Sequence, residues 1–124
     1  MLRRVCAGLR YFLSAVSVKT PMKAYNKLVR DKIPQIIAGA GGKADFRVLS
    51  EEEYAVCLEA KLDEEVAEFH RDKTPEELAD ILEVVYALAA ELGISREELM
   101  EVYQKKHDAR GGFENRVLLL SSER

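Results

Sequence analysis

The chain has 124 residues, a length typical of a single domain. Hydrophobic residues make up 48% of it, enough for a packed core, and a formal net charge of -3 argues against a general nucleic-acid-binding protein. The first 21 residues contain four bases and no acid, which leaves 15 of the 19 bases against all 22 acids in the remainder. No apolar run reaches the roughly 18 residues of a membrane span, so we expect no membrane partner.

The cysteines give an expectation about compartment. Cys6 and Cys57 are too few and too far apart in sequence to predict a disulfide framework. Cys57 lies among apolar residues of a predicted helix, where a buried thiol is expected. We therefore predict a reducing, cytoplasmic location.

Residues 1–22 form a basic leader with a modest apolar stretch. A signal or transit peptide, an upstream extension and a short helix covering an apolar surface are the alternatives. Arg10 interrupts the apolar stretch, which weakens the secretory interpretation. We expect a poorly ordered leader without function, followed by one domain over residues 23–124.

The first predicted elements are short. Residues 25–30 look extended, and Asp31 is positioned to cap a helix that starts at Lys32, buries its isoleucines and ends in the glycines of residues 39–42. Two strand-like runs follow, at residues 44–49 and 113–120. Because a lone strand cannot satisfy its backbone, we predict that these runs pair as an antiparallel ribbon.

Capping signals mark three longer helices. The capping box of residues 50–53 opens a helix that runs to about Arg71. A second helix spans Pro75 to Leu92 and stops at Gly93, and a third opens with the capping box of residues 95–98 and ends near Ala109. The predicted fold class is all-α: an antiparallel helical bundle with a small two-stranded ribbon, completed by oligomerisation.

Two acidic clusters flank the turn between the first two long helices. They read Glu64-Glu65-x-x-Glu68 and Glu77-x-x-Asp80. At 100° per residue, Glu65 and Glu68 border an apolar stripe, whereas Glu64 points almost directly away from it. The stripe consists of Leu58, Leu62, Val66 and Phe69. In the second helix, Glu77 and Asp80 share a line with Val84 and Leu88. The apolar stripe of that helix consists of Leu78, Ile81, Leu82, Val85, Ala89 and Leu92.

A short connection favours antiparallel packing, which would bring the two clusters together. Like charges in a semi-buried groove are costly unless a cation fills it. All-oxygen ligation suits a hard ion, so we predict Mg²⁺, with Mn²⁺ as the alternative, held by Glu65, Glu68, Glu77 and Asp80. Two other interpretations stay open: the glutamates could form a solvated face, and residues 74–77 also fit a capping box.

The spacing EExxE followed by ExxD resembles the signature of the all-α nucleoside triphosphate pyrophosphohydrolases, the MazG-like superfamily that also contains phosphoribosyl-ATP pyrophosphohydrolase. The segments YNKLVRDKIP, ELADILEVVYALA and RGGFENR are similar to one small single-domain branch of it. The resemblance implies hydrolysis of a nucleoside triphosphate between the α and β phosphates, which yields a monophosphate and pyrophosphate. It also implies a homodimer or a dimer of dimers, with the base near the subunit boundary.

Within that chemistry, we assign Glu64 to orienting or deprotonating the attacking water. A slight helix rotation would exchange its role with that of Glu65. The candidate residues for binding phosphate or nucleotide are all basic: Lys27, Arg30, Lys61, Lys106 and Arg110. An ordinary surface charge is the alternative for each of them.

Three functions therefore remain in competition. The first is a metal-dependent nucleotide pyrophosphohydrolase that removes non-standard or surplus nucleotides. The second is phosphoribosyl-ATP hydrolysis in histidine synthesis, which the KLVRDKIP and RGGF segments make less favoured. The third is a non-catalytic helical dimerisation module that keeps its acids as a solvated face. The sequence has no P-loop or dinucleotide-binding fingerprint.

Overall fold

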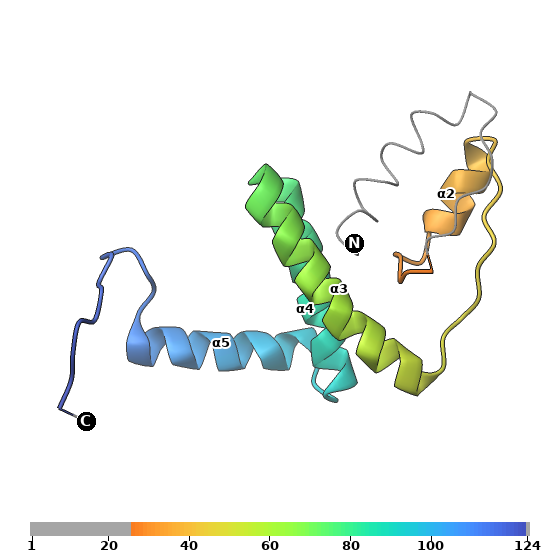
Figure 1. Ribbon diagram of the computed structural model, residues 1–124. Helices are drawn as coiled ribbons and strands as arrows, with labels where there is room; N and C mark the ends of the chain where they lie inside the picture. The colour runs from red at the N-terminus through yellow and green to blue at the C-terminus, as the bar shows by residue number, and fades with distance from the viewer. Residues whose placement is uncertain (1–25, 124) are drawn as a thin grey trace.

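The computed structural model describes residues 26–123. It contains α2 (Ile33–Gly39), α3 (Glu51–Asp72), α4 (Pro75–Glu91) and α5 (Arg96–Arg110), arranged as in Figure 1. Residues 26–123 contain no strand, so this part of the chain is all-helical, as predicted. The predicted leader, residues 1–22, lies outside the described residues. None of the helices between residues 26 and 123 is long and apolar enough to span a membrane.

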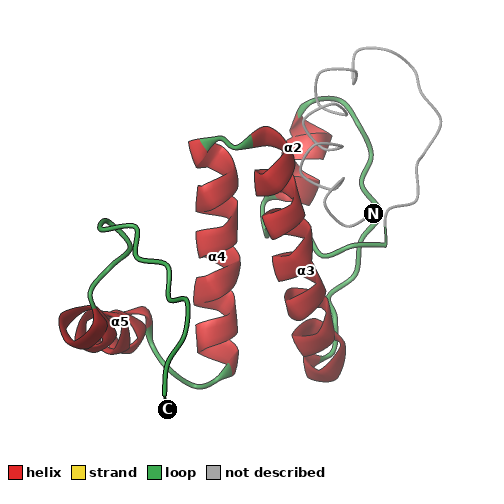
Figure 2. Cartoon of the chain, turned by 60° about the vertical axis from the view of Figure 1, so that its left-hand side comes forward, coloured by secondary structure: helices red, strands yellow, loops and turns green. Residues whose placement is uncertain are grey.

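α3 and α4 form an antiparallel hairpin, seen side by side in Figure 2. α3 ends because Lys73 adopts the left-handed conformation, with φ 50°, and its N–H donates to the carbonyl of Phe69 at 2.8 Å. Thr74 is extended, and Pro75 begins α4. Because only two residues separate the helices, the last turns of α3 lie against the first turns of α4. Both acidic clusters are therefore at the same end of the hairpin.

The predicted capping boxes of α3 and α5 are confirmed. The hydroxyl of Ser50 accepts from the N–H of Glu53 at 3.2 Å, and the Glu53 carboxylate accepts from the N–H of Ser50 at 3.0 Å. Ser95 and Glu98 make the same reciprocal pair at the start of α5. The prediction for α2 was wrong in two details. Its N-cap is Lys32, which makes no side-chain cap hydrogen bond, and none of its residues is buried.

The predicted ribbon is absent. Residues 44–49 and 113–120 are both irregular, and Figure 1 shows them on opposite sides of the molecule. The reason is the course of α5, which runs crosswise to the hairpin and carries the C-terminal segment away from the start of α3. The large apolar side chains of that segment are exposed; Phe113, for example, is 97% exposed.

The contact between α3 and α4 is unusually poor in apolar side chains. Among residues 26–123, the buried apolar residues are Leu58, Val84 and Ala89, whereas the buried polar residues are Lys61, Glu64, Glu65, Glu68 and Glu77. On α3, the face formed by these buried residues is rotated by about 90° around the helix axis from the apolar stripe that was predicted to face the core. Of the predicted stripes, Leu58 and Ala89 are buried, whereas Leu78 and Leu82 of α4 are 53% and 48% exposed.

Candidate metal centre

Three glutamates form the most buried part of the hairpin. Glu65 is 1% exposed, and Glu68 and Glu77 are both fully buried. A solvated face cannot describe residues that water does not reach. Nor does the capping-box alternative describe Glu77, because Thr74 makes no side-chain cap hydrogen bond. The structure therefore removes both alternatives for these residues.

The carboxylates converge in two overlapping groups. One oxygen from each of Glu65, Glu77 and Asp80 lies within 4.8 Å of the others, and the same holds for Glu68, Asp72 and Glu77. Opposite ligands of a Mg²⁺ ion are separated by about 4.2 Å, so small side-chain movements would bring either group into coordination. Glu77 belongs to both groups. The predicted ligands Glu65, Glu68, Glu77 and Asp80 are thus divided between two groups that share Glu77.

Asp72 is a candidate ligand that the sequence interpretation missed. It is the last residue of α3, one turn beyond Glu68, and its side chain is partly exposed. The i, i+4 spacing from Glu68 could have indicated that the two carboxylates share a helix face. The sequence interpretation overlooked Asp72 because it lies at the end of the helix, where a polar residue is commonly assigned to the following turn.

Cationic side chains contact the acids from three directions. The Lys61 ammonium is buried, 2.8 Å from an oxygen of Glu64 and 3.6 Å from one of Glu65. The Arg71 guanidinium lies 3.1 Å from Glu68 and 2.9 Å from Asp72. Arg30, from the segment before α2, contacts Asp80 at 2.7 Å. These pairs offset part of the repulsion within the cluster.

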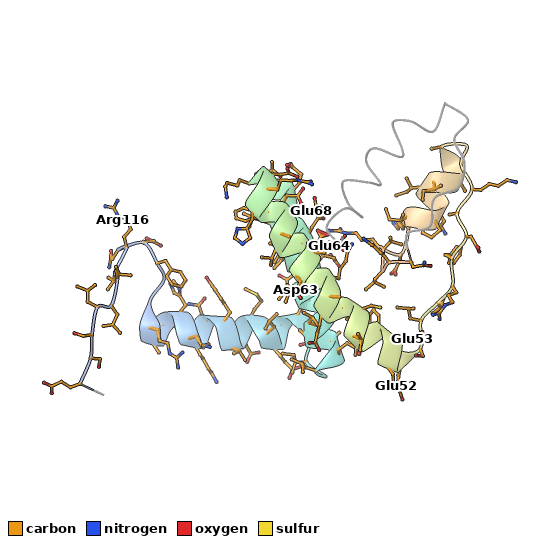
Figure 3. All side chains as sticks on the ribbon, viewed as in Figure 1. Glu52, Glu53, Asp63, Glu64, Glu68 and Arg116 are labelled. Atoms are coloured by element: carbon orange, nitrogen blue, oxygen red, sulfur yellow. The ribbon has the colours of Figure 1, made fainter. Side chains whose placement is uncertain are left out.

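The orientation predicted for Glu64 was wrong. Glu64 does not point into solvent; it is 3% exposed and paired with Lys61. The cause is the quarter-turn difference between the apolar stripe and the face of α3 that is buried, which brings Glu64 inside. Figure 3 shows Glu64 and Glu68 next to each other along α3, far from Glu52 and Glu53 at its N-terminal end. Glu64 is not a member of either converging carboxylate group.

The predicted phosphate-binding residues divide into two sets. Lys61 and Arg30 contact the acids directly, and Lys27 is half-buried in the segment that carries Arg30. Lys106 and Arg110 are exposed on α5, which projects away from the hairpin in Figure 1 and lies to one side of α4 in Figure 2. The structure therefore does not bring these last two to the acids of the same chain, and their role stays a prediction.

Glu68 has a raised pKa. Burial is the main cause, because it disfavours the charged form, and the neighbouring carboxylates of Glu77 and Glu65 add to it, while Arg71 opposes the shift. Glu53, at the other end of α3, shows the contrasting case. Hydrogen bonds from Arg47 and Ser50 lower its pKa to about 2.

These shifts predict opposite effects of pH on stability. Because the folded state raises the pKa of Glu68 above its ordinary 4.5, the native protein binds this proton more tightly than the unfolded chain. The free energy of unfolding should therefore fall as pH rises from the ordinary value through the folded one. Glu53 should have the opposite effect, because its folded pKa is lowered. It should stabilise the protein at pH values above its ordinary pKa, and this stabilisation should be lost as pH falls toward 2.

Denaturant unfolding in EDTA between pH 3 and pH 8 measures both effects. In Glu68→Gln, we expect the free energy of unfolding no longer to fall as pH rises above the ordinary glutamate pKa. The variant should also be more stable than wild type at pH 7. The control Glu53→Gln should instead lower stability at pH 7. A Glu68→Gln protein that is less stable than wild type at pH 7 would show that the buried carboxylate is not under electrostatic strain.

Comparison with known proteins gives little further information. The chain is 50% identical over 48 residues to a protein of Mycolicibacterium smegmatis that is described only as uncharacterized; the match covers 39% of this chain and 49% of that relative. The matched region thus spans about half the length of the relative. No family model matches the chain, and neither does any solved structure.

Proposed function

We propose that the protein is a metal-dependent nucleoside triphosphate pyrophosphohydrolase. The observation that supports this most directly is the burial of Glu65, Glu68 and Glu77 at the contact between α3 and α4, with Asp72 and Asp80 completing two converging groups. A protein that gained only packing from this contact would be more stable with apolar side chains there. The motif resemblance to the MazG-like superfamily agrees with this function.

The carboxylate groups fit a hard divalent cation. Glu65, Glu77 and Asp80 would hold one Mg²⁺ or Mn²⁺, and Glu68, Asp72 and Glu77 would hold a second, with Glu77 shared. When bound, such ions neutralise phosphate oxygens and make a water molecule more acidic. The nearby bases Lys61 and Arg71 contact carboxylates of the cluster and help to orient them.

Glu64 is the residue that we propose to receive the proton of the attacking water. The water oxygen forms a bond to the α-phosphorus, the bond from that phosphorus to the α–β bridging oxygen breaks, and pyrophosphate leaves. The ammonium of Lys61, 2.8 Å away, holds the Glu64 carboxylate in a fixed position. Glu64 lies one turn before Glu68 and is adjacent to Glu65, which places it beside both carboxylate groups.

A second copy of the chain completes the proposed enzyme. Part of the apolar stripe of α4 lies outward, with Leu78 and Leu82 about half exposed, and α5 has no buried residue. A helix that presents apolar side chains on an outer face needs a partner surface. We therefore propose a homodimer or a dimer of dimers that binds the base near the subunit boundary, acting in the cytoplasm on non-standard or surplus nucleotides.

The activity can be tested with a panel of nucleotides. The protein should release pyrophosphate, and not single phosphate, from at least one ribo- or deoxyribonucleoside triphosphate in the presence of Mg²⁺, and EDTA should abolish the release. Phosphoribosyl-ATP belongs in the panel because it is the rival substrate. Comparison of kcat/KM across the panel identifies the preferred substrate.

Glu68→Gln is the variant that ties this activity to the site. It removes one buried oxygen charge without changing side-chain size, so pyrophosphate release should fall strongly while the protein stays folded. If no nucleotide yields pyrophosphate, the enzymatic proposal fails. If release survives in Glu68→Gln, the reaction occurs at another site.

A further inference from the structure

The contact between Arg30 and Asp80 links two distant parts of the chain. The Arg30 Nη2 atom donates to Asp80 Oδ1 at 2.7 Å, across 50 residues of sequence. The carbonyl of Arg30 accepts the N–H of Ile33 at 3.0 Å, so the backbone of Arg30 is held against the first turn of α2. Arg30 is therefore positioned by a different element from the hairpin that carries the acids.

Asp80 is the acid of its group that solvent can reach. Its side chain is 21% exposed, and that of Arg30 is 54% exposed, whereas Glu65 and Glu77 are essentially buried. Lys61 and Arg71 pair with carboxylates of their own helix, one to four residues away. Arg30 instead reaches the cluster from outside it. A metal or a phosphate can therefore approach this pair from solvent.

We propose that Arg30 competes with the metal for Asp80 and, once displaced, binds a phosphate group of the substrate. This inference rests on the proposed function and adds an order of events to it. A carboxylate oxygen that coordinates a divalent cation is a weaker partner for a second cation beside it. The planar guanidinium fork of Arg30 matches phosphate oxygens as well as carboxylate oxygens. Its displacement therefore frees a phosphate-binding group beside Asp80.

This mechanism predicts effects of opposite sign for one substitution. Arg30→Gln removes the competing cation, so divalent metal should bind more tightly, by about two- to fivefold, since exposed ion pairs contribute up to about that much. The same change removes a charged phosphate ligand, so pyrophosphate should bind the metal-loaded protein more weakly, by about tenfold. A residue that only held Asp80 in place would weaken both steps when lost.

The experiment measures the two bindings separately on the full chain. Mn²⁺ binding is followed by electron paramagnetic resonance of the free ion, and pyrophosphate binding by calorimetry at saturating Mn²⁺. Arg47→Gln is the matched control, because Arg47 is also exposed and also pairs with a single acid, Glu53 at 2.8 Å, away from the cluster. It should change neither binding. Thermal unfolding confirms that each variant is folded.

A double-mutant cycle localises the effect. In an Asp80→Asn background, which binds Mn²⁺ more weakly overall, Arg30→Gln should no longer tighten Mn²⁺ binding, because the competition has lost its target. If wild type binds no Mn²⁺, the proposed function fails. If wild type binds Mn²⁺ and Arg30→Gln leaves that affinity unchanged or weaker, the competition is overturned while the metal site stands. Unchanged pyrophosphate affinity in Arg30→Gln overturns the transfer to phosphate.

Discussion

Glu77→Gln is expected to abolish most of the pyrophosphate release, with kcat/KM falling at least about 100-fold. Glu77 is fully buried and belongs to both converging carboxylate groups, so its loss affects both candidate metal positions at once. Asp72 belongs to one group only and is partly exposed, so Asp72→Asn should be the milder change. Steady-state kinetics with the best nucleotide of the panel, over a range of Mg²⁺ concentrations, gives this ranking.

Stability should respond in the opposite direction from activity. The glutamine of Glu77→Gln carries no charge at the buried cluster, so in EDTA the variant should be as stable as wild type or more stable. Glu76→Gln is the matched control, because Glu76 is the exposed neighbour in the first turn of α4. It should retain activity. An active Glu77→Gln protein would contradict the assignment of Glu77 as the shared ligand.

The second large effect concerns the outward apolar stripe of α4. In a single chain Leu82 is 48% exposed, so Leu82→Glu would change the free energy of unfolding by only about 0.5 kcal/mol if the protein acted alone. If a second copy covers Leu82, the substitution places an unpaired charge in the interface. We therefore expect Leu82→Glu to dissociate the assembly at micromolar concentration and to lower its thermal midpoint strongly.

Sedimentation and thermal unfolding over a range of protein concentrations test this prediction. The thermal midpoint of wild type should rise with concentration, as expected when folding is coupled to association. Ala90→Glu, which adds the same charge at another exposed position of α4, is the control and should remain associated. A wild-type protein that sediments as a folded, active monomer would contradict the proposed dimer.

The positions of the helices could be predicted from local sequence. Each capping box joins residues three apart, as in Ser50 with Glu53 and Ser95 with Glu98, so its geometry is complete within one helical turn. The two-residue link at Lys73 and Thr74 likewise determines that α3 and α4 are antiparallel. These local features bring the two acidic clusters together at one end of the hairpin.

The faces that meet could not be predicted in the same way. α3 carries an apolar stripe and an acidic line about a quarter turn apart, and periodicity alone favoured the stripe. The structure buries the acidic line and Lys61 instead, which places Glu64 inside. It also leaves Leu78 and Leu82 of the α4 stripe about half exposed. The predicted ribbon failed for a related reason, because the direction of α5 depends on how it leaves α4 and not on the composition of the two strand-like runs.

The sequence by itself determined the four helical segments of residues 26–123, their antiparallel link and the identity of the acids, because each depends on residues within one or two turns of each other. Only the tertiary structure decided which helix faces are buried, that Asp72 joins the cluster and that Arg30 pairs with Asp80 across 50 residues. Such contacts depend on how one helix is rotated about its axis relative to another. That rotation is determined by all the surfaces of the chain that can pack together, and not by a local segment.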